Sequence, residues 1–115
     1  MTVPISAEDL DRAKRQVREA IAAGAQMLEL RMDYLDPLDA KSAAALIAEV
    51  REAGQGRVPA IVTCRDAKEG GARPHPDELR LRVLRAAVEA GADFIDVEYA
   101  NFIRPEFGQG IRAAL

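Results

Sequence analysis

The chain has 115 residues, 16 basic and 19 acidic side chains and a formal net charge of −3, so it allows at most one ordinary domain and has no basic excess for nucleic-acid binding. With 49% hydrophobic and 30% charged residues, its composition is typical of a folded globular chain. The single cysteine excludes an internal disulfide framework and a multi-cysteine zinc site. The lack of a long apolar run or an apolar leader predicts a cytoplasmic protein without a membrane span.

Short strand-like segments alternate with longer segments of helical pattern along the chain. The strand-like segments are apolar and rich in β-branched residues, and they cover residues 2–6, 27–33, 60–65 and 94–99. The segments of helical pattern carry apolar residues three and four positions apart, and they cover residues 7–23, 39–53, 76–90 and 107–115. This alternation predicts βαβ units and a parallel sheet. Four such units form either an open sheet or half of a (β/α)8 barrel.

The turns that join helices to strands share a pattern. Ser6 and Asp9 are a predicted capping pair at the start of the first helix. Gly24 and Gly91 are predicted helix stops, and each lies in an Ala-Gly-Ala turn between a helix and a strand. The likeness indicates either a true structural repeat or the reuse of one turn chemistry, and both alternatives predict a parallel α/β architecture.

Charged side chains of three neighbouring strands are predicted to share one face of the sheet. Because side chains alternate along a strand, the apolar side chains on the opposite face, and Cys64 with them, should be buried under the helices. The charged group lies toward the carboxyl ends of the strands and consists of Glu29, Arg31, Asp33, Arg65, Asp96 and Glu98. In (β/α)8 barrels the active site forms at this rim.

Three interpretations of this charged group stay open. The side chains could form an ion-pair network of purely structural value. They could also lie on a solvated face of an open sheet, which requires no function. The third interpretation is a binding site in which the two guanidinium groups bind a planar anion such as a carboxylate.

The loop after Arg65 carries a further candidate residue. Gly70 and Gly71 permit unusual backbone angles and could bring Glu69 over the strand ends, where a carboxylate can do acid–base work. We expect Lys68 to be a solvated surface charge and His75 to be a capping or surface residue. The sequence contains none of the common nucleotide-binding, zinc-protease or serine-hydrolase motifs.

Three of these segments resemble motifs of the type I 3-dehydroquinate dehydratases. Residues 29–33 read Glu-Leu-Arg-Met-Asp and resemble that family's E-x-R-x-D strand. Residues 63–71 resemble its T-x-R segment followed by E-G-G, and residues 94–98 resemble its I-D-[LV]-E strand. Residues 2–6 resemble its first barrel strand, so the resemblance covers nearly the whole chain in order.

The resemblance implies a fold and an activity. The fold would be the first four βα units of a (β/α)8 TIM-type barrel, a half-barrel with a parallel sheet in which residues 1–115 form a single partial domain. The family dehydrates 3-dehydroquinate to 3-dehydroshikimate in the shikimate pathway without a metal or cofactor. A lysine forms a Schiff base with the substrate ketone, and a histidine removes the adjacent proton.

The resemblance also implies residue roles. Glu29, Arg31 and Arg65 would bind substrate, and Glu69 would assist the catalytic histidine. The residues that would support them by ion pairing are Asp33, Asp96 and Glu98. Pro4 stands where some family members carry a substrate-binding serine.

The family's catalytic histidine and lysine follow its fifth and sixth strands, and neither Lys68 nor His75 matches their motifs. We therefore expect the 115-residue chain, as an N-terminal half, to be inactive alone. Its expected partners are the small-molecule substrate 3-dehydroquinate and either a second copy of the chain, as a homodimer, or a complementing C-terminal half. The alternative is a non-enzymatic α/β half-barrel module that binds anions or associates through its sheet edges.

Overall fold

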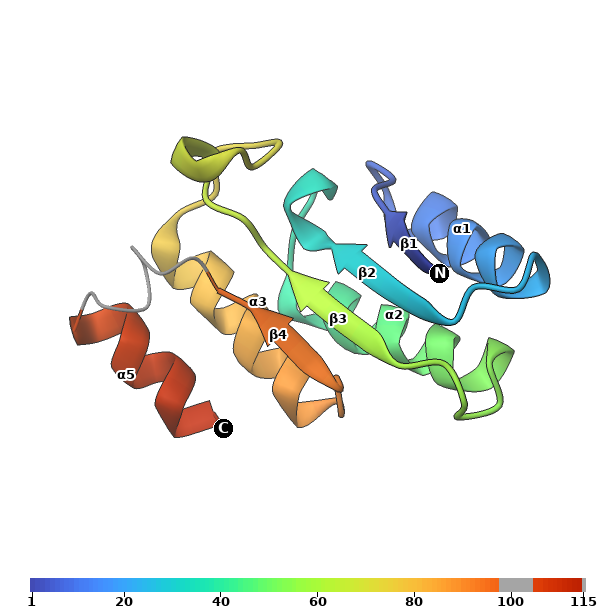
Figure 1. Ribbon diagram of the computed structural model, residues 1–115. Coiled ribbons are helices and arrows are strands. Elements are labelled where there is room, and N and C mark those ends of the chain that lie inside the picture. The colour runs from blue at the N-terminus through green and yellow to red at the C-terminus, as the bar shows by residue number, and fades with distance from the viewer. Residues whose placement is uncertain (98–104, 115) are drawn as a thin grey trace.

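The computed structural model describes residues 1–97 and 105–114, in which strands alternate with helices (Figure 1). The strands are β1 (Thr2–Ile5), β2 (Met27–Arg31), β3 (Ala60–Thr63) and β4 (Phe94–Asp96). The helices are α1 (Leu10–Ala22), α2 (Ala40–Ala53), α3 (Asp77–Glu89) and α5 (Pro105–Ala114), with short 3-10 turns η1 (Met32–Tyr34) and η2 (Ala67–Glu69). The strands form one parallel sheet in the order β1-β2-β3-β4, which confirms the predicted α/β architecture.

The helices cover one face of the sheet and leave the other open (Figure 1). Alternate residues of the strands, such as Leu28, Leu30 and Val62, are fully buried between the sheet and the helices. Burial of an aliphatic side chain of this size contributes about 1.5–3 kcal/mol. Cys64 is buried as well, as the alternation predicts. None of the described helices is long and apolar enough to cross a bilayer.

Side chains of the open face lie in rows across the strands. Glu29 is in register with Ile61 of β3, which is in register with Phe94 of β4. Phe94 is 56% exposed, an unusual value for a large apolar residue in a sheet. Among the described residues β1 pairs only with β2 and β4 only with β3, so the sheet has two unpaired edges as well as an uncovered face.

Helices α1 and α2 each begin after an aspartate whose side chain accepts a backbone N–H of the first turn. Asp9, not the Ser6–Asp9 pair, caps α1 by accepting from the backbone N–H of Arg12, because the helix begins one residue after Asp9. Asp39 caps α2 through Ser42, whose side-chain and backbone hydrogen bonds lower the pKa of the Asp39 carboxyl.

The two Ala-Gly-Ala turns have the same structure. Gly24 and Gly91 have φ angles of +96° and +95°, which favour glycine. In each turn the following alanine donates its N–H to the carbonyl five residues earlier, Ala25 to Ala20 and Ala92 to Ala87. The turns therefore deliver β2 and β4 to the sheet in the same way.

The strands are shorter than the periodicity predicts. β2 ends at Arg31 because the chain turns into η1, and β3 ends at Thr63 rather than at residue 65. Asp33 is therefore not a strand residue that shares a face with Arg31 by alternation; it lies on the η1 turn. Glu98, the last predicted residue of the charged group, lies outside the described residues.

Candidate functional site

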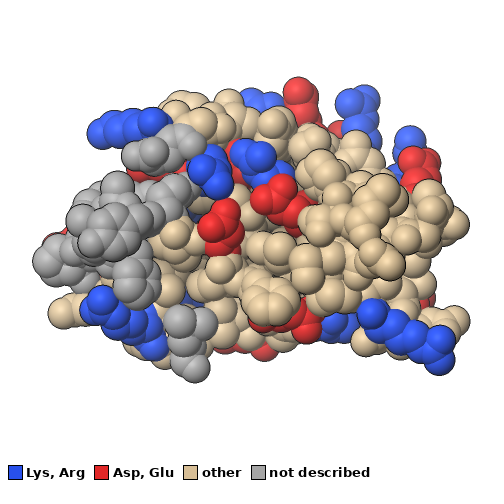
Figure 2. Space-filling model, viewed as in Figure 1, with Lys and Arg blue, Asp and Glu red and all other residues tan. Residues whose placement is uncertain are grey.

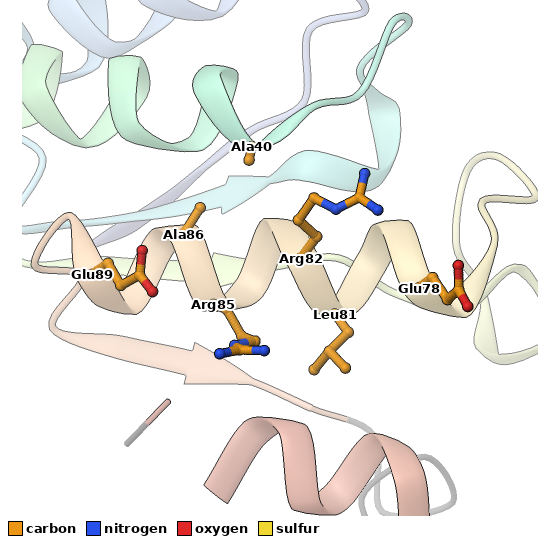
Figure 3. A pocket seen from close by; sticks show the side chains of 7 residues that line it. All are labelled: Ala40, Glu78, Leu81, Arg82, Arg85, Ala86 and Glu89. Atoms are coloured by element: carbon orange, nitrogen blue, oxygen red, sulfur yellow. The ribbon is translucent and has the colours of Figure 1, made fainter. Parts of the chain in front are cut away.

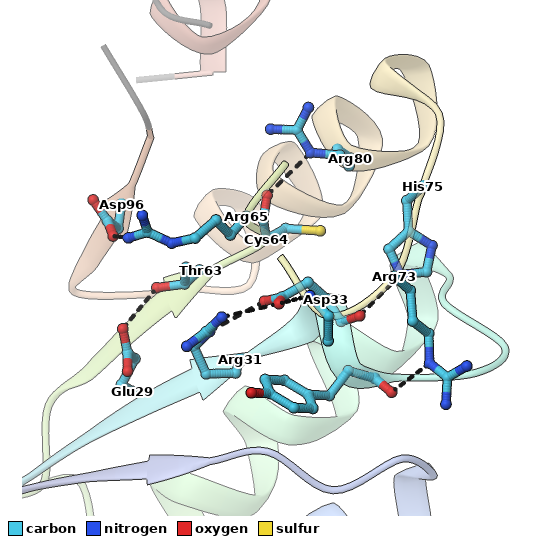
Figure 4. Close-up of polar contacts among 12 residues, drawn as sticks. Glu29, Arg31, Asp33, Thr63, Cys64, Arg65, Arg73, His75, Arg80 and Asp96 are labelled. Carbon is cyan, nitrogen blue, oxygen red and sulfur yellow. Dashed lines mark hydrogen bonds and ion pairs between the residues drawn. The ribbon is translucent and has the colours of Figure 1, made fainter. Parts of the chain in front are cut away.

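Three of the predicted side chains gather on the open side of the sheet. Glu29 and Arg31 come from β2, and Arg65 follows the end of β3 (Figure 4). All three are half-buried. Seen from this side, acidic and basic side chains lie next to one another near the middle of the open face (Figure 2). The alternation argument therefore placed Glu29 and Arg31 of β2 correctly, whereas Arg65 lies beyond the end of β3, where strand alternation does not apply.

Arg31 is held by the most buried carboxylate in this group. Its Nε and Nη2 atoms donate to Oδ1 and Oδ2 of Asp33 at 3.2 and 3.0 Å, and the Asp33 side chain is fully buried. The guanidinium also lies 5.1 Å from the ring centroid of Tyr34, a cation–π contact. The hydrogen bond with Asp33 raises the pKa of Arg31, although burial opposes it. Arg31 is thus a fixed cation at the end of β2.

Asp33 also ties η1 to the loop that follows β3. Its Oδ2 accepts the backbone N–H of Ala72 at 3.0 Å, and its carbonyl lies 3.1 Å from Nε2 of His75. Arg73 donates to the carbonyl of Tyr34 at 3.1 Å. These contacts, drawn in Figure 4, dock the loop onto the segment that fixes Arg31. His75 is therefore a half-buried docking residue rather than a cap or a free surface residue.

A second set of contacts crosses from β2 to β4. Nη2 of Arg65 lies 3.2 Å from Oδ2 of Asp96. The hydroxyl of Thr63, which is 1% exposed, donates to Oε2 of Glu29 at 3.3 Å. The register places Thr63 directly between Arg31 and Asp96, so one buried hydroxyl holds Glu29 within the charged group.

The two glycines of the loop are favoured for different reasons, a φ of +92° at Gly70 and close packing at Gly71. A Cβ atom on Gly71 would lie 2.3 Å from the carbonyl oxygen of Arg65, so only glycine fits there without a shift. The Gly71 N–H donates to the carbonyl of Asp66 at 2.9 Å, which closes the loop on itself. Glu69 is the last residue of η2 within this loop; its side chain is outside the described part of the structure.

Arg80 is a buried charged residue beside the end of β3 that the sequence analysis missed. It lies on α3 and is 1% exposed, and it contacts the backbone at the end of β3. The signal was present in the spacing, because Arg80 precedes the buried residues Val83, Leu84 and Ala87 at helical intervals. Lys68, in contrast, is exposed as predicted.

The arrangement favours binding of an anion that also carries hydroxyl groups. Two guanidinium groups can bind a carboxylate in fork geometry, and the carboxylate of Glu29 can accept hydrogen bonds from hydroxyls. Among the described residues no three His, Cys, Asp or Glu side chains gather in a way that could hold a metal ion. The described side chains of this face can recognise a ligand by hydrogen bonds and by charge.

A groove of about 390 Å³ lies elsewhere, along the outer side of α3 (Figure 3). Its lining contains two arginines and two glutamates whose charges balance, and consists of Ala40, Glu78, Leu81, Arg82, Arg85, Ala86 and Glu89. It belongs to the helix layer and not to the open face of the sheet, so we do not assign the anion site to it.

Comparison with known proteins gives consistent matches. A family model described as type I 3-dehydroquinase matches residues 1–113. A 3-dehydroquinate dehydratase from Klebsiella pneumoniae is 33% identical over 101 residues, which make up 86% of this chain and 40% of the relative.

Solved structures match over nearly the whole chain. A type I 3-dehydroquinate dehydratase from Clostridium difficile matches with a TM-score of 0.82 and 22% identity, over 98% of this chain and 44% of that protein. The corresponding enzyme from Enterococcus faecalis matches with a TM-score of 0.78 and 26% identity, over 98% of this chain and 48% of that protein. The chain therefore spans less than half the length of these relatives and matches the N-terminal part of their barrel fold.

Proposed function

The chain belongs to the type I 3-dehydroquinase family, and from this premise we propose that it provides one wall of a 3-dehydroquinate dehydratase active site. In this proposal the chain is a single partial domain that binds the substrate. A complementing C-terminal half supplies the Schiff-base lysine and the histidine that the family resemblance implies. Dehydration of 3-dehydroquinate would then require both halves.

The observation that carries this proposal is the convergence of Glu29, Arg31 and Arg65 on the open face of the sheet. The substrate is a carboxylate with several hydroxyl groups, so it matches a site that has two guanidinium groups and an acceptor carboxylate. Arg31 and Arg65 would bind the substrate carboxylate or its hydroxyl oxygens, and Glu29 would accept a substrate hydroxyl.

Two of the remaining predicted residues act through these three. Asp33 orients Arg31 by two hydrogen bonds, and Asp96 pairs with Arg65 on the side of β4. We assign Glu69 the role of assisting the histidine of the complementing half, and Glu98 a further ion pair with the substrate-binding group. A side chain held at two points loses less conformational entropy when it binds a ligand.

The proposed partner is supported by what the sheet leaves open. The outer edges of β1 and β4 lack a strand partner among the described residues, and the charged face is uncovered. A groove of about 360 Å³ beside the β1 edge is lined by both β1 and α1 residues, namely Val3, Pro4, Ile5, Ser6, Gln16, Glu19 and Ala20. A second βα half-barrel would pair with both edges and close the site.

One observation favours a second candidate, a non-enzymatic module that associates through its sheet edges. Arg31 and Arg65 already have carboxylate partners in Asp33 and Asp96, so both guanidinium groups are paired without a ligand. In that case another chain would pair with the sheet edges, and the ion pairs would be structural.

Complementation distinguishes the two candidates. The chain is mixed with the C-terminal part of the Klebsiella pneumoniae relative, and formation of the conjugated product from 3-dehydroquinate is followed by ultraviolet absorbance. We expect activity in the mixture and none in either half alone, because each half lacks groups that the reaction needs. A stable complex of the two halves without activity contradicts the proposal and favours the module.

A further inference from the structure

We propose that Arg80 is a positioning residue that aims Arg65 at the substrate; this inference rests on the proposed function. The two residues come from different elements, Arg80 from α3 and Arg65 from the end of β3. Figure 4 shows Arg80 against the carbonyl of Cys64, and the Arg65 side chain extending from the strand end toward Asp96. Arg80 therefore acts on Arg65 through the backbone between them.

The contacts of Arg80 bracket Arg65 in the chain. Its Nε donates to the carbonyl of Cys64 at 3.1 Å, directly before Arg65. Its Nη1 lies 3.6 Å from the carboxylate of Asp66, directly after Arg65, and 2.9 Å from that of Asp77 on its own helix. One planar guanidinium thus contacts both residues that flank Arg65 and sets the direction in which the Arg65 side chain leaves the backbone.

The same contacts extend into the loop that carries Glu69. The Asp66 carboxylate accepts the backbone N–H of Lys68 at 3.0 Å, and the Asp66 carbonyl accepts the N–H of Gly71 at 2.9 Å. Arg80 therefore also fixes the root of this loop. A shift of Asp66 would move the two candidate site residues of this segment together.

The choice of arginine at this position points to a role beyond packing. Burial of a charge is costly unless it is fully paired, and an apolar residue fills a core position without that cost. The neighbouring positions Val83 and Leu84 on the same helix face are apolar and buried. A guanidinium has several N–H donors and contacts a carbonyl and two carboxylates here, whereas a lysine offers a single point charge.

The test compares Arg80→Met and Arg80→Lys with Arg82→Met, an exposed arginine on the same helix. The first readout is the NMR signal of the Arg65 Nε–H group in the full chain, assigned by its loss in Arg65→Lys. We expect both Arg80 variants to shift or broaden this signal and to leave the Arg31 signal in place. Arg82→Met should change neither signal.

The second readout is the kinetics of the complemented enzyme. We expect Arg80→Met to raise KM for 3-dehydroquinate about tenfold, because one misdirected charge-assisted contact is worth roughly that factor. Arg80→Lys keeps the positive charge but loses the planar guanidinium, so it should give a KM between those of the wild type and Arg80→Met. If Arg80→Met does not fold, Arg80→Lys replaces it in both readouts.

The two readouts separate this inference from the proposed function. An unchanged Arg65 signal in a folded Arg80 variant overturns the positioning role, even if the unfolding temperature falls. A shifted signal, when the wild-type mixture shows no activity, supports the inference about Arg65 geometry and contradicts the proposed function. An unchanged KM in an active mixture also overturns the positioning role.

Discussion

Replacement of Asp33 with alanine is expected to lower the free energy of unfolding by about 2–4 kcal/mol. The Asp33 side chain is fully buried and makes two hydrogen bonds to Arg31 and one to the N–H of Ala72. Its removal leaves the Arg31 side chain, which is 19% exposed, without its carboxylate partner. It also releases the loop after β3 from η1. Urea denaturation followed by circular dichroism measures the change.

Two variants serve as references for this experiment. Asp33→Asn keeps an acceptor for Ala72 but loses the charge, so it should cost about half as much as the alanine substitution. Asp36→Ala removes a carboxylate from the same segment that is 72% exposed and lies 3.8 Å from Arg73. This surface pair should contribute at most about 0.5 kcal/mol. If Asp36→Ala lowered the free energy of unfolding as much as Asp33→Ala, the result would contradict the importance of the buried Asp33–Arg31 pair.

Replacement of Arg65 with alanine is expected to reduce kcat/KM of the complemented enzyme by about 100-fold to 1,000-fold. Arg65 lies at the end of β3, is half-buried and pairs with Asp96 at 3.2 Å, so it presents a preorganised cation to the substrate. Initial rates over a range of 3-dehydroquinate concentrations measure the effect. Arg65→Lys should recover only part of the activity, because lysine cannot bind a carboxylate in fork geometry.

The matched control for this substitution is Arg57→Ala. Arg57 is an exposed arginine in the turn between α2 and β3, and the described structure shows no ion pair for it. Its removal changes the net charge by the same amount as Arg65→Ala, so it accounts for long-range electrostatic effects on the substrate. Equal losses in the two variants would contradict a direct role for Arg65.

Much of the fold could be predicted from the sequence because local patterns determine it. Alternation along the strands predicted which side chains lie under the helices and which lie on the open face. In β2, for example, Leu28 is buried under the helices and Glu29 lies on the open face. The Ala-Gly-Ala turns at Gly24 and Gly91 predicted both helix ends, since their backbone angles favour glycine.

The site could be predicted only in part because its contacts are long-range. Asp33 was identified, but its position on η1 and its bonds to the loop after β3 depend on where β2 ends. Arg80 was missed because a charged residue on a helix is usually solvated, and its pairing with the end of β3 appears only when the two elements pack. Strand ends and buried charges are set by tertiary contacts that no local pattern records.

Substrate trapping tests the central claim, that this chain binds 3-dehydroquinate while another half performs the covalent step. The mixture of the two halves is treated with 3-dehydroquinate and borohydride, and the mass of each half is then measured by mass spectrometry. We expect a reduced substrate adduct on a lysine of the complementing half, an unmodified chain, and loss of the adduct when Arg31 and Arg65 are both replaced with alanine. An adduct on Lys68 or another lysine of this chain would contradict the account.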